Sequence, residues 1–318
     1  MKTKKRPYVK ISQPSAFEFF ERFPDEKSAR EYLESARWPS GIRCIHCGHD
    51  YVWKIRDGKI YTCKSCRSQF TIRTGTVMED SHIPLRKWLY AMYLVSTARK
   101  GISSIQLAKE IGVTQKSAWF MLGRIREACQ TEGQLSGTVE ADETYIGGKE
   151  SNRHESKKLK LGRGTAGKAV VFGARSRDGE ARAEVISGTD TETMCKAVNA
   201  AVSSGSRLYT DDHAAYKSAE GYRHESVRHS AKEYVRGDVH TNSIESLWAL
   251  LKRGHYGVYH QWSDKHLHRY VDEFVFRLNT KNLPAFFLDE KTCGINFIRL
   301  LVAGMEGRRL TYGDLKHG

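Results

Sequence analysis

The chain has 318 residues, with 52 lysines and arginines against 37 acidic residues, and so a formal net charge of +15. This length fits about two domains, and so large a basic excess favours a polyanionic partner, with nucleic acid ahead of a membrane surface. No run of about 18 apolar residues and no signal-peptide core is present, so we expect a cytoplasmic protein without a membrane partner.

The chain begins with a basic tail and two short helices. Residues 1–10 are rich in lysine and arginine. Helices are expected over Ser15–Phe23 and Asp25–Arg37, because Pro24 separates them and Asp25 is placed to cap the second. We assign residues 1–40 to this segment.

Four cysteines follow as two CxxC pairs, namely Cys44, Cys47, Cys63 and Cys66. Between the pairs lie two expected strands joined at Asp57-Gly58, a dipeptide typical of hairpin turns. Four thiolates facing one another across a hairpin form a tetrahedral set that suits Zn²⁺ and leaves no open position. Residues 41–78 therefore predict a zinc ribbon with one structural zinc.

After Pro84 the spacing of apolar residues becomes helical. Helices are expected over Leu85–Arg99, from Ser103 or Ser104 to Ile111, and over Gln115–Cys129. The last two are joined by a short turn that contains glycine, which matches a helix-turn-helix but also fits a plain helical hairpin. We assign residues 82–130 to a helix-turn-helix domain. Its second helix supplies the candidate DNA contacts Gln115, Lys116, Arg124 and Arg126.

A polar linker leads to an acidic strand, Val139–Gly148, and then to a basic loop rich in glycine, Ser151–Lys168. The loop contains the patterns GxGxxG and GxxxxGK. It does not predict a nucleotide site, because a strand rather than a helix is expected after it and Ala169 stands where a P-loop needs Ser or Thr. A cationic loop that lies along a DNA backbone fits better. Its candidate DNA contacts are Lys157, Lys158 and Lys160.

The rest of the chain alternates strands with helices. Strands are expected over Lys168–Ala174, Ala181–Ser187, Arg207–Thr210 and Ser226–His229. Helices are expected over Asp190–Ser203, Asn242–Arg253, Ser263–Leu278 and Cys293–Ala303. This order predicts a mixed α/β domain over residues 137–290, followed by a C-terminal helix and tail over residues 291–318.

Three acids stand out in this domain. Asp142 lies on the first strand, Asp211 directly follows the fourth, and Glu245 lies on the helix that begins at Asn242. A strand carboxylate must be solvated, paired or bound to a metal, so an exposed edge strand is the alternative for Asp142. A period of two places Asp142 on one face of its strand and Glu143 on the other.

Together these motifs resemble the DDE-type transposases of bacterial insertion sequences, in particular the lineage with an N-terminal zinc ribbon. The resemblance runs from about Phe23 to Leu310 and rests on FPDEKSAREYLESARWPSGIRCIHCG, VEADETYIGG, YTDDHAAY and HTNSIESLWALLKRGHYGVYH. It implies a ribonuclease-H-like core, with a mixed sheet between flanking helices and three acids around two Mg²⁺ or Mn²⁺ ions. Such a protein works in the bacterial cytoplasm, on the nucleoid.

Carried onto this sequence, the resemblance makes Asp142, Asp211 and Glu245 the catalytic metal ligands, with Asn242 as an alternative third ligand. Lys252 and Arg253 become DNA contacts. Water would free a 3′-hydroxyl at each element end, and that hydroxyl would attack a target phosphodiester. The implied partners are double-stranded DNA, as terminal inverted repeats and as target, and further copies of the chain in a homodimer or higher oligomer.

Two other functions compete with an active transposase. One is a domesticated DNA-binding regulator that has lost catalysis, and the presence of all three acids argues against it. The other is a different ribonuclease-H-like DNA nuclease, for which a zinc ribbon would be unusual. A strand-transfer assay separates the three.

Overall fold

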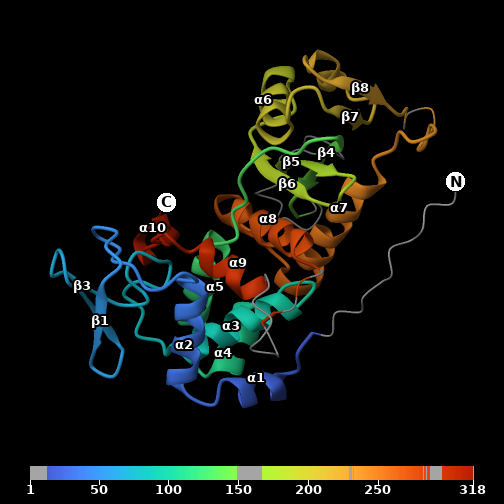
Figure 1. Cartoon of the computed structure of the whole chain (residues 1–318). Coiled ribbons are helices and arrows are strands. Elements are labelled where there is room, and N and C mark those ends of the chain that lie inside the picture. The colour runs from blue at the N-terminus through green and yellow to red at the C-terminus, as the bar shows by residue number, and fades with distance from the viewer. Residues whose placement is uncertain are drawn as a thin grey trace, which may run out of the picture. The chain divides into compact units, whose positions relative to one another are not determined.

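The computed structural model describes residues 13–148, 167–228, 231, 233–281, 283, 285–286 and 296–317 (Figure 1). The chain divides into two compact units. Unit 1 comprises Met1–Arg99, Ser104–Ala128 and Thr280–Tyr312. Unit 2 comprises Lys100–Ser103, Cys129–Asn279 and Gly313–Gly318. The segments expected as separate N-terminal, zinc-ribbon and helix-turn-helix parts thus contribute mainly to unit 1. The segment expected as the C-terminal part is divided, because Gly313–Gly318 belongs to unit 2.

Unit 1 is helical outside the ribbon. Its helices are α1 (Ala16–Arg22), α2 (Glu26–Arg37), α3 (Leu85–Thr97), α4 (Ser104–Ile111), α5 (Gln115–Glu127) and α9 (Phe297–Ala303). Local sequence signals start the first two, because Ser15 and Asp25 each form a capping box with the third residue of the helix. Helix α9 packs against α2 and α3.

The ribbon of unit 1 is a small antiparallel sheet. Its strands are β1 (Val52–Ile55), β2 (Ile60–Cys63) and β3 (Gln69–Phe70), in the order β1-β2-β3. The loop between β1 and β2 has positive φ at Arg56, Asp57 and Gly58, as the Asp-Gly pair predicts for a tight hairpin. The short β3 was not expected from the sequence.

Unit 2 is built on a mixed sheet of five strands. They are β4 (Thr138–Ile146), β5 (Ala169–Ser176), β6 (Ala181–Ile186), β7 (Arg207–Thr210) and β8 (Arg223–Ser226). The order is β6-β5-β4-β7-β8, with β4, β5 and β6 antiparallel and with β7 parallel to both β4 and β8. The acidic strand β4 is therefore central, which removes the exposed-edge alternative. Strand β8 lies three residues before the predicted segment.

Helices cover both faces of this sheet. They are α6 (Thr191–Ala201), α7 (Asn242–Gly254) and α8 (Asp264–Asn279), with a π-helical turn over His255–Tyr259 and a 3-10 turn over Ala214–Ser218. Helix α10 (Tyr312–His317) ends the described chain. Val139, Ala141 and Phe172 pack with α6, whereas Ile146 and Val171 pack with α7 and α8. Among the described residues, no helix is long and apolar enough to cross a membrane.

Candidate metal centres and nucleic-acid surface

The four ribbon cysteines converge on one point. Their Sγ atoms all lie within 4.8 Å of one another, and the Cys44–Cys66 and Cys47–Cys63 pairs are each 3.6 Å apart. A disulfide needs about 2.05 Å, whereas two sulfurs bound tetrahedrally to zinc at about 2.3 Å lie roughly 3.8 Å apart. The cysteines therefore fit a structural zinc ion, as predicted.

Local contacts prepare this site for a cation. The side chain and backbone N–H of Ser68 donate to Cys66 and lower the pKa of its thiol, which favours the thiolate form that binds metal. The same segment is tied to α2 through Glu34, which accepts from Tyr61 Oη at 2.5 Å and pairs with Lys54 Nζ at 2.5 Å. Burial raises the pKa of the Tyr61 phenol and keeps it a donor.

A second candidate centre lies in unit 2, where two neighbouring parallel strands run side by side. Strands β4 and β7 pair in parallel up to Glu140 and Tyr209. Two residues further along this register, Asp142 comes opposite Asp211. Carboxylate oxygens of Asp142, Glu143 and Asp211 lie within 4.8 Å of one another, and we call this group the carboxylate cluster. Hard divalent cations such as Mg²⁺ and Mn²⁺ prefer such oxygens.

The cluster concentrates negative charge away from bulk water. Burial, together with the charges of Glu143 and Asp211, raises the pKa of Asp142 to about 7. Burial, and then the charge of Asp211, also raises the pKa of Glu143. Like charges held close together resist full ionisation, and a divalent cation would remove that repulsion. The donor set and its electrostatics therefore fit a hard divalent metal.

Hydrogen bonds hold all three of these carboxylates in place. The Trp248 indole Nε1 donates to Asp142 Oδ2 at 2.9 Å, and Tyr216 Oη donates to Glu143 Oε2 at 2.9 Å. Gly173 makes room for the indole, because it pairs with Asp142 across β4 and β5 and a Cβ there would lie 2.4 Å from Trp248. Asp211 Oδ1 accepts from the backbone N–H of His213 at 3.0 Å.

The strand period did not anticipate Glu143 as a cluster member. Glu143 and Asp142 do leave opposite faces of β4, since Glu143 contacts Tyr216 on the α6 side and Asp142 contacts Trp248 on the α7 side. Near the end of β7, however, the two carboxylates reach round to one point. The sequence signal that could have identified Glu143 is its position next to Asp142, in a sheet where Asp211 follows another strand.

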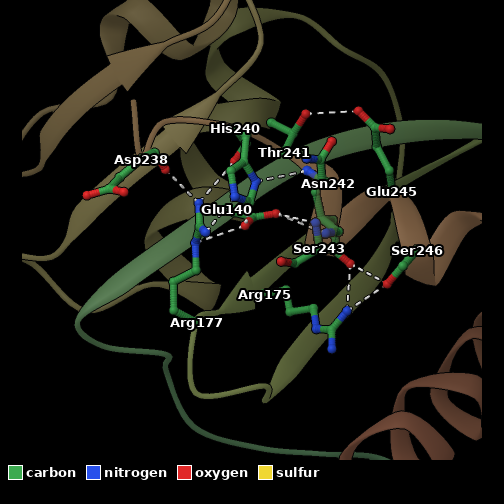
Figure 2. A network of polar contacts seen from close by, with 11 residues as sticks. Glu140, Arg175, Arg177, Asp238, His240, Thr241, Asn242, Ser243, Glu245 and Ser246 are labelled. Atoms are coloured by element: carbon green, nitrogen blue, oxygen red, sulfur yellow. Dashed lines mark hydrogen bonds and ion pairs between the residues drawn. The ribbon is translucent and has the colours of Figure 1, made fainter. Parts of the chain in front are cut away.

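Glu245 is not part of the carboxylate cluster. The apolar stripe of α7, which includes Ile244 and Trp248, faces the sheet. Glu245 therefore projects from an exposed face of the helix, where its Oε1 accepts from Thr241 Oγ1 at 3.0 Å (Figure 2). Asn242 is also exposed.

The candidate DNA contacts fall into three groups. Lys116, in the first turn of α5, and Arg253, near the end of α7, are exposed, and Lys252 is half-buried. Lys116 Nζ lies 4.6 Å from the centre of the Tyr312 ring. The loop lysines Lys157, Lys158 and Lys160 lie outside the described residues.

Arg124 and Arg126 are placed differently from the expectation of a DNA-facing helix. They are 5% and 3% exposed. The Arg124 guanidinium donates to the backbone oxygens of Leu310 and Glu79 at 3.0 and 2.9 Å. Arg124 therefore lies inside unit 1, and both side chains are buried rather than on a face open to a DNA groove. A basic residue on an expected recognition helix does not by itself reveal this burial.

The sequence of this chain matches proteins of mobile genetic elements. The family model of the ISXO2-like transposase domain matches residues 134–279, and that of the transposase zinc-ribbon domain matches residues 24–69. Both matches define the class as transposase. An uncharacterized protein in transposable element ISH50 of Halobacterium salinarum is 32% identical over 247 residues, covering 73% of this chain and 83% of that protein. The chain belongs to the ISXO2-like transposase family, of the IS1595 type, with an N-terminal zinc ribbon.

Proposed function

We propose that this chain binds the terminal inverted repeats of an insertion sequence and catalyses metal-dependent DNA strand cleavage and strand transfer. The observation that carries the proposal is the carboxylate cluster, which lies within the region that matches the transposase family model. The mixed sheet, with helices on both faces, supports the ribonuclease-H-like core that the sequence resemblance implies. From the same resemblance we propose that the protein acts on the bacterial nucleoid.

The residues proposed to hold the active-site ions are Asp142 and Asp211, with a third acid completing the set. Held by these carboxylates, two divalent ions would supply activation of the attacking oxygen and stabilisation of the leaving oxygen in an in-line displacement. Glu245 is the third acid that the family resemblance proposes, and Glu143 is the acid that lies beside the other two. The protein orients Asp142 through Trp248 and Glu143 through Tyr216.

DNA binding is proposed for both units. In unit 1 we retain the helix-turn-helix proposal for α4 and α5, with Lys116 in the exposed first turn of α5 as the contact. Arg124 and Arg126 leave the proposed contact set because they are buried. In unit 2, the proposed DNA contacts are Lys252 and Arg253, near the end of α7, and the loop lysines Lys157, Lys158 and Lys160. Pairing two element ends calls for a homodimer or a higher oligomer.

A strand-transfer assay tests the proposal. Purified chain is incubated with labelled DNA that carries the ends of its own element, a target plasmid, and MgCl₂ or MnCl₂. We expect cleavage at the 3′ ends and joining to the plasmid, both lost in Asp142→Asn and Asp211→Asn. Asp178→Asn, a substitution in the exposed turn between β5 and β6, is the matched control and keeps both activities.

Three outcomes would contradict the proposal. Equal activity of the wild type and the Asp142→Asn variant would separate any cleavage from the cluster. Specific binding without cleavage by the wild type would favour a regulator. Cleavage without joining would favour a nuclease of another kind.

A further inference from the structure

Glu140 is a fully buried carboxylate, with 0% of its surface exposed, on the central strand β4. Its Oε2 accepts from the backbone N–H groups of Ser243 and Ile244, at 2.7 and 3.1 Å (Figure 2). These groups open helix α7, whose own N-cap residue, Thr241, makes no side-chain capping bond. A carboxylate from the sheet thus satisfies two backbone donors and meets the positive end of the helix dipole.

The other oxygen of Glu140 is held by charge. Its Oε1 lies 3.0 Å from Arg177 Nε and 3.4 Å from His240 Nδ1, and the Arg177 contact is an ion pair rather than an aligned hydrogen bond. Arg177 Nη2 also donates to the backbone oxygen of Asp238 at 2.9 Å. The segment that leads into α7 is therefore fastened to the sheet through Glu140 and Arg177, as Figure 2 shows.

A third contact binds the first turn of the helix. Arg175, on β5, donates from Nη1 to the Ser243 backbone oxygen and to Ser246 Oγ, each at 2.7 Å. Glu140 and Arg175 from the sheet thus contact the first turn of α7, and Arg177, in the turn after β5, contacts the segment that leads into it. Burying a charge is unfavourable unless it is paired and hydrogen-bonded. If packing were the only requirement at position 140, an apolar side chain would be favoured there.

The same helix touches the carboxylate cluster one turn further on. Glu140 and Asp142 share the α7 face of β4, and Trp248 donates to Asp142 from the second turn of the helix. Helix α7 is thereby tied to β4 at two points, at its first residues through Glu140 and at Trp248 through Asp142. Displacing the first point shifts the helix along the strand and changes how the indole meets the carboxylate.

We propose that Glu140 is a positioning residue of the metal centre, which sets α7 on β4 so that Trp248 orients Asp142. The proposal deepens the proposed function, because the Asp142 carboxylate is the ligand being oriented. Neither Glu140 nor Arg177 contacts the reacting atoms; they act through the helix.

The first test reads the helix position without DNA or metal. Uniformly ¹⁵N-labelled full-length chain gives indole N–H resonances from its six tryptophans, and Trp248→Phe identifies the one from Trp248. We expect Glu140→Gln to shift the Trp248 resonance, while the resonances of the four tryptophans in unit 1 stay where they are. Glu225→Gln, which removes an exposed charge from β8 of the same sheet, is the matched control and leaves all six unchanged.

The second test reads the consequence for chemistry. We expect Glu140→Gln to reduce kcat for MnCl₂-dependent cleavage of element-end DNA about 10- to 100-fold, the usual effect of losing a residue behind a metal ligand. KM for DNA should stay at the wild-type value, because no DNA contact changes. An unmoved Trp248 resonance overturns the proposal, whether or not cleavage falls. A moved resonance with wild-type kcat also overturns it.

Arg177→Gln keeps the proposal testable if Glu140→Gln unfolds and all six indole resonances collapse. The Arg177 side chain is 33% exposed, so its replacement disturbs packing less. We expect a smaller shift of the Trp248 resonance in the same direction and a smaller fall in kcat. A Trp248 resonance identical to the wild type would then overturn the proposal. If the wild type itself never cleaves, the proposed function fails, while the resonance test still decides the role of Glu140.

Discussion

The two candidate metal centres are assembled in opposite ways. The zinc ligands come from two CxxC pairs on one small hairpin, and all four are recognisable from spacing alone. The carboxylate cluster joins residues on β4 to Asp211 beyond β7, and an antiparallel pair of strands and helix α6 intervene in the chain. Short-range geometry defines the first centre, whereas sheet register defines the second.

The two metal centres are therefore expected to differ in how metal binding affects folding. The four cysteines form a closed set on a hairpin with little core of its own, since its Tyr61 and Phe70 pack on Trp38 at the end of α2. The carboxylate cluster lies on a sheet that apolar clusters on both faces already stabilise. We therefore expect metal to fold the first site, and to bind a preformed but electrostatically unfavourable second site.

Loss of zinc should have the largest effect on folding. Cys63→Ser should abolish stoichiometric zinc binding and unfold the ribbon, because structural zinc contributes about 10–16 kcal/mol to folding in small zinc domains. Zinc content by atomic emission and thermal unfolding by circular dichroism measure this. Cys195→Ser, outside the ligand set, is the matched control. One zinc per chain retained in Cys63→Ser would show that Cys63 is not a zinc ligand.

Removing an acid from the cluster should have two opposite effects. We expect Asp211→Asn to lower cleavage about 1000-fold, corresponding to roughly 4 kcal/mol of charge stabilisation. The same change should raise Tm of the metal-free protein, because it removes repulsion from Asp142 and Glu143. Single-turnover cleavage and calorimetry measure the two effects. A lower Tm in metal-free Asp211→Asn would show that the acids stabilise the fold.

Metal affinity distinguishes the two candidates for the third acid, Glu143 and Glu245. Because Glu143 lies in the cluster and Glu245 does not, we expect Glu143→Gln to weaken Mn²⁺ binding in the absence of DNA about 10-fold or more. Glu245→Gln should leave that affinity unchanged. Electron paramagnetic resonance of free Mn²⁺ measures both. The reverse order of affinities would require α7 to bring Glu245 to the site when metal binds.

Acidity provides the smallest of these effects. The folded-state pKa of Asp142, about 7, lies above its ordinary value of 3.8. Its favourable contribution is therefore complete below about pH 4 and is lost as the pH rises through 7. We expect Tm of the metal-free protein to fall between pH 5 and 7.5, and Asp142→Asn to flatten that slope.

A bound metal ion favours the ionised form of Asp142 instead. The affinity for Mn²⁺ should therefore rise as the pH rises over the same range. Titrations of the wild type at pH 5.5 and pH 7.5 measure this. Equal Mn²⁺ affinity at the two values would mean that Asp142 is ionised throughout.

Several features followed from local sequence. The CxxC spacing gave the zinc set, and Ser15 and Asp25 started their helices through their own side chains. Asp142 and Asp211 were recognisable because each carries its charge on or directly after a buried strand. These inferences hold because residues close in the chain, or fixed by strand period, have few alternative placements.

Tertiary structure decided the remainder. Register between β4 and β7 brought Glu143 into the cluster, and packing of the apolar face of α7 left Glu245 outside it. Burial of α5 turned Arg124 into an internal donor, and the sheet assigned Glu140 to the start of α7. Sequence determines which residues carry charge. Which charges meet depends on contacts between segments far apart in the chain, and no local periodicity encodes those contacts.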